Sequence, residues 1–227
     1  MRLMTIHTLA VVGLASSVVA RAQGTFQNLD FEQANIVPIV GSPLYPYAVT
    51  VANALPYWSV FYGNVEQSQI TFNDPSLGAT AVTLYTTGYP VIEGNYSVLL
   101  QGGVTLSRGA ETPAAASISQ TGLIPAGTQS LLFETELGYE LLDVYIGSQN
   151  VPLTAVRSGP NYTLYGTDIS AWAGQTEQLT FSAPSSGVLN DWLLDDISFS
   201  AVPEPGMVAL SAMSGLLFGA RKCFARR

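Results

Sequence analysis

The sequence predicts an all-β fold, either a sandwich or a barrel. Two observations support this prediction. Apolar and polar residues alternate with a period of two in several short runs, which is the pattern of half-buried strands. Groups of turn-forming Gly, Pro, Asn and Ser separate these runs. Many short strands punctuated in this way are typical of sandwiches and barrels.

Five runs are predicted strands, and in chain order they are 81–85, 96–101, 131–137, 142–146 and 178–182. The alternation is clearest in 131–137, where Leu131, Phe133 and Thr135 share one face and the intervening glutamates share the other. The small-residue stretch Pro113–Ala116 is predicted to be a loop. With no internal repeat and no break in composition, residues 23–201 are predicted to form one domain.

The charge of residues 23–201 excludes several functions. This range holds fifteen carboxylates and two cations, Arg108 and Arg157, for a net charge of −13. Such a surface cannot neutralise phosphates, so nucleic acid and anionic membrane surfaces are excluded as partners. The only histidine, His7, and the only cysteine, Cys223, lie outside the range. Disulfides, histidine-dependent triads and most zinc or copper sites are therefore excluded as well.

Residues 1–22 have the layout of a secretory signal peptide. Arg2 provides the positive start, and residues 8–20 form an apolar stretch. Ala20-Arg21-Ala22 then supplies the small-x-small pattern of a cleavage site. Export by the Sec machinery is predicted.

The last 26 residues, 202–227, combine three patterns. Prolines at positions 203 and 205 flank Glu204 and block helix formation there. Residues 206–220 are uncharged and mostly apolar, but as a helix they span only about 22 Å, which is short for a bilayer core that needs about 20 apolar residues. A basic cluster closes the chain and would remain cytoplasmic: Arg221, Lys222, Arg226 and Arg227.

This tail, with Pro203, Glu204 and Pro205 followed by an apolar run and a basic end, resembles the PEP-CTERM sorting signal of Gram-negative bacteria. The same tail is also catalogued as the ice-binding-protein C-terminal motif. The resemblance implies that an exosortase recognises Pro-Glu-Pro and processes the tail. It implies export across the inner membrane to the cell envelope or outer surface, with transient anchoring by the transmembrane segment 206–220. The alternative is an ordinary single C-terminal transmembrane helix.

The body carries landmarks in a characteristic order. Asn28-Leu-Asp-Phe-Glu32 opens it and Leu194-Asp-Asp-Ile-Ser-Phe199 closes it. Three further segments lie between them, at 58–61, 119–125 and 168–174. This order resembles the galactose-binding-like jelly rolls of bacterial surface proteins and carbohydrate-binding modules. The resemblance implies a single antiparallel jelly-roll or β-sandwich domain whose opening and closing strands lie near each other.

The same resemblance implies a structural calcium ion where the opening and closing strands meet. By motif its ligands are Glu32 and Asp196, with Asp30 and Asp195 as alternates. Calcium takes six to eight oxygen ligands, carboxylates among them. Because adjacent strand residues point to opposite faces, only one of the two aspartates is expected to face the site. The alternative is that these carboxylates form an exposed acidic strand end or cap turn amides.

Two other patterns are candidates for carbohydrate chemistry. Aromatic residues that could stack on sugar rings are found at Tyr57, Trp58, Phe61, Tyr62, Tyr85, Tyr89 and Trp192, although most aromatic residues of a sandwich belong to its core. Glu134 and Glu136 share one face of a predicted strand, about 7 Å apart, which suits a glycosidase pair. The alternative for this pair is a solvated strand face, so no catalytic residue is assigned.

The sequence therefore predicts an exported, non-catalytic bacterial surface or extracellular-matrix protein. Its predicted partners are an exosortase, the Sec machinery and extracellular polysaccharide or another envelope component, and its specific ligand-binding residues are left open. A secreted glycan-active hydrolase that uses a carboxylate pair is the alternative. Ice binding is a weaker third hypothesis, because the chain has no repeated Thr or Ser array.

Overall fold

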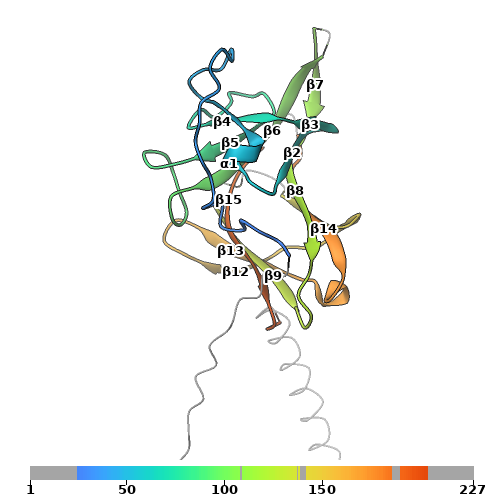
Figure 1. Ribbon diagram of the computed structural model, residues 1–227. Coiled ribbons are helices and arrows are strands. Elements are labelled where there is room, and N and C mark those ends of the chain that lie inside the picture. The colour runs from blue at the N-terminus through green and yellow to red at the C-terminus, as the bar shows by residue number, and fades with distance from the viewer. Residues whose placement is uncertain (1–24, 108, 137, 139–141, 186–189, 204–227) are drawn as a thin grey trace, which may run out of the picture.

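The computed structural model describes residues 25–107, 109–136, 138, 142–185 and 190–203 (Figure 1). These residues form two β-sheets packed face to face. The larger sheet has nine strands, in the order β1 (Ala48–Thr50), β4 (Gln69–Phe72), β5 (Ala81–Tyr85), β6 (Ser97–Ser107), β15 (Asn190–Ser200), β9 (Ser130–Glu136), β13 (Thr163–Asp168) and β12 (Thr154–Ser158), with β7 (Ala110–Ala114) paired to β6. The all-β sandwich expected from the sequence is confirmed.

The smaller sheet has six strands. Their order is β11 (Gln149–Asn150), β10 (Asp143–Ile146), β14 (Thr176–Ala183), β8 (Ala116–Leu123), β2 (Ser59–Tyr62) and β3 (Val65–Gln67). A one-turn helix, α1 (Val51–Ala54), and a short 3-10 turn, η1 (Ser170–Trp172), complete the described elements. Strand neighbours pair antiparallel as predicted, with one difference: β4 and β5 are parallel.

The core lies between the two sheets. Phe133 of β9 meets Phe181 of β14 edge to face, with ring centroids 5.0 Å apart, so the alternation of β9 sends its apolar face inward as predicted. A second, smaller cluster lies apart from this core and contains Tyr85, Leu99 and Leu193 together with Ile92, which belongs to the segment between β5 and β6. That segment also carries the turn 92–97, so its position fixes one wall of the site described below.

The five predicted strands correspond to β5, β6, β9, β10 and β14, although β6 extends to Ser107. Two local predictions were wrong. Pro113–Ala116 is not a loop, because it comprises the end of β7 and the start of β8; β6 and β7 form a long hairpin that projects from the sandwich (Figure 1). Asn28–Glu32 is not a strand but a pair of turns.

Those turns bury two residues of the opening motif while leaving its carboxylates outside. Phe31 takes a left-handed φ of 57° and packs against Trp58 at 5.8 Å, and Leu29 is also fully buried. Asn28 holds the turns in place: its Oδ1 accepts from Gln33 N at 2.9 Å, and its carbonyl accepts from Trp58 Nε1 at 2.9 Å. The conformation is set by side-chain hydrogen bonds rather than by a ladder, and strand periodicity does not report such bonds.

Candidate functional site

An acidic cleft lies where the opening turns meet the closing strand. Ile197 N of β15 donates to Leu29 O at 3.0 Å, which confirms that the two ends of the body meet. Beside this contact is a cleft of about 440 Å³. Its lining contains all four carboxylates expected from the sequence, together with the turn that precedes β6: Asp30, Glu32, Glu93, Gly94, Asp195 and Asp196.

A β-bulge brings Asp195 and Asp196 to this one cleft. In the pairing of β15 with β9, Asp195 lies opposite Glu134 and Ser198 opposite Leu132, so β15 carries one residue more than its partner between these pairs. Asp196 occupies the bulge with a φ of 41°. The expectation that only one aspartate could face a given site was therefore wrong, because a bulge interrupts the period of two.

Glu32 clamps the turn 92–97. Its Oε1 accepts from Asn95 N at 2.7 Å and from Tyr96 N at 3.0 Å, and its Oε2 accepts from Asn95 Nδ2 at 2.8 Å. Gly94 is required at the tip of this turn, since it has a φ of 65° and a Cβ there would collide with the Glu32 carboxylate. Turn capping was the alternative reading of Glu32, and these contacts match it.

Asp195 holds the same turn from the other side. Its Oδ2 accepts from Ser97 Oγ at 2.6 Å and from Glu93 N at 3.2 Å, while its Oδ1 accepts from Asp196 N at 2.8 Å. Burial raises the pKa of the Asp195 carboxyl to about 7, although these hydrogen bonds act to lower it. Glu32 and Asp195 are thus committed to N–H and O–H donors of the protein.

A second group of carboxylates shares two members with this cleft and adds Glu134. One oxygen each from Glu93, Glu134 and Asp196 lies within 4.8 Å of the others. Glu134 is 4 % exposed; the Tyr162 hydroxyl hydrogen-bonds its carboxylate, which leaves Oε2 without a hydrogen-bond partner. Burial also raises the pKa of Glu134. A solvated strand face was therefore the wrong interpretation of this residue.

Sequence reasoning missed Glu93 and Glu134 as members of the site. The alternation of β9 placed Glu134 on the face away from the core, but the segment that covers this face is a loop with no periodicity. The register of β9 against β15, which sets Glu134 opposite Asp195, is likewise a long-range feature. The calcium ligand pair Glu32 and Asp196 stays a prediction, and the structure brings both residues to the one cleft.

A separate groove of about 410 Å³ is lined by aromatic rings and polar groups. Tyr165 and Trp192 meet edge to face at 6.2 Å, and Tyr162 stands beside them with Arg157 stacked over its ring at 5.7 Å. Arg157 Nη2 also donates to the Tyr162 hydroxyl at 3.0 Å. The remaining lining is mostly polar or small: Thr135, Glu136, Gly138, Ser158, Gly159, Pro160, Asn161 and Thr163.

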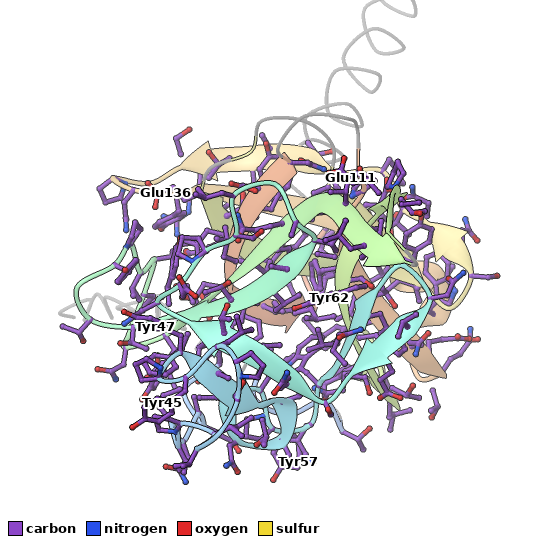
Figure 2. The ribbon with its side chains drawn as sticks, turned by 90° about the horizontal axis from the view of Figure 1, so that it is seen from above. Tyr45, Tyr47, Tyr57, Tyr62, Glu111 and Glu136 are labelled. Carbon is purple, nitrogen blue, oxygen red and sulfur yellow. The ribbon has the colours of Figure 1, made fainter. Side chains whose placement is uncertain are left out.

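The other aromatic candidates divide between core and surface. Trp58 and Tyr85 are buried, whereas Tyr57 is 56 % exposed and Tyr89, which packs on Tyr85 at 5.2 Å, is 42 % exposed. The Tyr62 hydroxyl accepts from Val82 N at 3.1 Å. In the view of Figure 2, Tyr57 lies at the border of the molecule opposite Glu136, far from the aromatic groove. Trp192 is the one sequence candidate that lines that groove, and it is itself buried, at 7 % exposed.

The predicted targeting segments fall almost entirely outside the described residues. Pro203 is described and exposed. The signal peptide, the transmembrane segment 206–220 and the remaining tail residues lie outside: Glu204, Pro205, Arg221, Lys222, Arg226 and Arg227. Within the ranges that are described, no helix has the length and apolar character needed to cross a bilayer.

No family model matches the chain, and no curated protein sequence does so either. Among solved structures, the enzymatically active domain of tailspike protein 4 from bacteriophage CBA120 is 14% identical, with 78% of this chain and 21% of that one covered and a TM-score of 0.41. This chain therefore spans about a fifth of the tailspike structure.

Two smaller solved structures are similar over nearly their whole length. The K1 cleaved adhesin domain of Lys-gingipain from Porphyromonas gingivalis W83 is 13% identical, with 68% of this chain and 97% of that one covered and a TM-score of 0.40. The family 11 carbohydrate-binding module from Clostridium thermocellum, solved with a mixed-linked tetrasaccharide, is 7% identical, with 70% and 96% covered and a TM-score of 0.37. The chain is a β-sandwich that resembles such modules and adhesin domains, and likeness at this level assigns it neither ligand nor reaction.

Proposed function

We propose that this is an exported, non-catalytic protein of the bacterial cell surface or extracellular matrix that binds polysaccharide. The groove at the half-buried Tyr162 and Tyr165, which also borders the buried Trp192, carries the proposal. Aromatic rings offer flat apolar surfaces to the C–H faces of sugar rings, and the polar groups around them can bond hydroxyls. A concave site with aromatic walls and a few convergent polar groups is the ordinary form of a small-molecule or oligosaccharide site.

The groove has suitable chemistry for a neutral sugar chain. Thr163 and Glu136 offer a hydroxyl and a carboxylate beside the rings, and Asn161 offers its amide oxygen, because its Nδ2 already donates to Val91 O and Ile92 O. The charge of −13 on residues 23–201 repels polyanions, so uronic or sulfated polysaccharides are disfavoured. A neutral polysaccharide is therefore the ligand class proposed.

The absence of catalysis is part of the proposal, and the positions of the two strand glutamates support it. Glu136 lines the groove, whereas Glu134 does not and instead clusters with Glu93 and Asp196. A glycosidase needs both carboxyl groups on the scissile bond, one as acid and the other as base or nucleophile. We further propose that the sandwich is a galactose-binding-like jelly roll, sorted through its Pro-Glu-Pro tail.

Binding can be tested on the full chain, purified in mild detergent and applied to an array of neutral and acidic glycans. Tyr162→Ala should weaken binding of a captured neutral glycan about tenfold, close to 1.4 kcal/mol. Tyr57→Ala is the matched control, since it removes an exposed tyrosine at the opposite border, and it should change nothing. If the parent binds no glycan, or if both variants lose the same amount of affinity, the groove is not the polysaccharide site.

The same glycans test the alternative of hydrolysis. We expect no new reducing ends after prolonged incubation. Reducing ends that appear with the parent chain and vanish in Glu136→Gln would replace binding with catalysis as the function.

Sorting has a separate test. Replacing Pro203, Glu204 and Pro205 with alanine should leave the exported protein at the mass of the unprocessed tail. A mature mass identical to that of the parent would contradict recognition of this motif.

A further inference from the structure

We infer that Glu93, Glu134 and Asp196 form a binding site for a calcium-sized divalent cation. Their three ligand oxygens lie within 4.8 Å of one another. Calcium binds oxygen at 2.3–2.6 Å, so two ligands on opposite sides of the ion lie about 4.6–5.2 Å apart. All three carboxylates can therefore reach one calcium ion with little rearrangement.

The buried state of Glu134 points to a ligand independently of the clustering. Its side chain is 4 % exposed, and its Oε2 has no hydrogen-bond partner. Leaving a charged oxygen buried and unpaired is costly, and proteins resolve such groups by pairing them or coordinating a metal. The same carboxylate meets Glu93 and Asp196, so a cation bound among the three would compensate its buried charge.

The surrounding charges also favour a cation from outside the chain. Asp30, Glu32 and Asp195 line the adjoining cleft, which adds further negative charge beside the cluster. Arg157 is the nearby cation, but it donates to the Tyr162 hydroxyl at 3.0 Å and stacks over that ring. No ion pair joins Arg157 to Glu134 among the described residues, and its charge offsets only part of the effect of burial, which raises the pKa of Glu134.

The donor set favours a hard divalent cation, and the irregular coordination that calcium accepts favours calcium over magnesium. Three carboxylates are hard oxygen ligands, and residues 23–201 contain neither histidine nor cysteine to favour zinc or copper. Magnesium binds oxygen at 2.0–2.1 Å, so its opposite ligands are only about 4.2 Å apart and must form a near-ideal octahedron. This site keeps Asp196 from the sequence prediction but uses Glu93 and Glu134 in place of Glu32, whose oxygens accept three N–H bonds.

Calcium alone is the probe, added to the full chain after chelator treatment. Titration calorimetry should give one site, and calcium at about a hundred times its Kd should raise the Tm by about 5–10 °C. Glu134→Gln keeps the side-chain volume and removes a buried charge, so in chelator it should melt no lower than the parent. With calcium it should lose most of the Tm rise and at least tenfold in affinity.

Three controls decide the outcome. Glu136→Gln, on the same strand two residues away, should bind calcium like the parent. Glu93→Gln changes an exposed residue, so it tests the site even if a substitution at Glu134 impairs folding. Equal concentrations of magnesium should raise the Tm less than calcium does.

The site is refuted if calcium at 10 mM neither shifts the melt nor gives a calorimetric signal. It is also refuted if Glu134→Gln and Glu93→Gln keep the affinity of the parent, or if Glu32→Gln lowers it more than they do. Calcium is measured here without any glycan, so failure of the groove to bind polysaccharide leaves this result standing.

Discussion

Replacing Glu32 with alanine should destabilise the protein by about 2–4 kcal/mol, because Glu32 clamps the turn that covers the acidic cleft. Its carboxylate accepts three hydrogen bonds, from Asn95 N, Asn95 Nδ2 and Tyr96 N. A bond to a charged group contributes about 1.5–3 kcal/mol, but two of these three are exposed, and removing a charge also relieves repulsion in the cleft. We therefore expect less than the ~4.5–9 kcal/mol to which three such bonds would sum.

Thermal melts followed by circular dichroism in chelator would measure this loss. A domain of this size changes its Tm by about 2–4 °C per kcal/mol, so the expected drop is about 5–15 °C. Hydrogen exchange should also speed up at the amides of Asn95 and Tyr96, which a general loss of stability would not single out. Asp30→Ala is the matched control, since within the described part of the chain Asp30 accepts one hydrogen bond, from Glu32 N at 3.4 Å. Equal melting of the two variants, or unchanged exchange at the turn, would refute the clamp.

Three further predictions concern the core residue Trp58, the turn glycine Gly94 and the buried Asp195. In urea denaturation, Trp58→Ala should lower the free energy of unfolding by about 3–5 kcal/mol, because Trp58 is buried. Replacing the adjacent, exposed Tyr57 with alanine should change it by no more than about 0.5 kcal/mol. Similar losses in the two variants would contradict the division between core and surface. Gly94→Ala should lower the Tm as Glu32→Ala does, because a Cβ at position 94 would collide with the Glu32 carboxylate. If the Tm losses of the two single variants simply add in the double variant, this shared cause is wrong. The raised pKa of Asp195, about 7 in the folded protein against 3.8 as its ordinary value, means that the folded state binds the proton more tightly. In chelator, the free energy of unfolding should therefore fall by at most about 4 kcal/mol as the pH rises from about 4 to 7. Asp195→Asn should flatten this pH dependence. Equal pH dependence in parent and variant would show that Asp195 is not its cause.

The sequence predicted the fold class well because strand periodicity is a local property. The alternation that buries Phe133 is visible within seven residues, and β5 matches its predicted bounds at Ala81 and Tyr85. Pro113–Ala116 was misread because small residues and proline are typical of loops. As the outermost strand of a hairpin, β7 tolerates both, since an edge strand needs fewer ladder hydrogen bonds.

The candidate site was only half predictable, for a different reason. The order of the motifs predicted that Glu32 and Asp196 lie where the opening and closing segments of the body meet. The structure brings both residues to the acidic cleft at that place. Glu93 and Glu134 reach it through a loop that folds back over the sheet and through the register of two strands more than fifty residues apart in sequence. No local pattern in the sequence records either event.

The bulge at Asp196 connects the failure of the strand rule to the chemistry of the site. A regular β15 would turn one of Asp195 and Asp196 towards the core, where an aspartate has no partner among apolar neighbours. The extra residue instead keeps both carboxylates away from the apolar core, with the buried Asp195 bound by Ser97 Oγ and two backbone amides and Asp196 beside Glu134. Bulges cost ladder hydrogen bonds and commonly redirect side chains next to functional sites. Because residues 23–201 contain only two arginines for fifteen carboxylates, the chain itself cannot neutralise the charge that this arrangement concentrates. Backbone amides take up part of it at Glu32 and Asp195, and the remainder at Glu134 requires a proton or a cation from solution. At the proposed calcium site, calcium and protons would then compete for the same carboxylates, so calcium affinity should weaken as the pH falls.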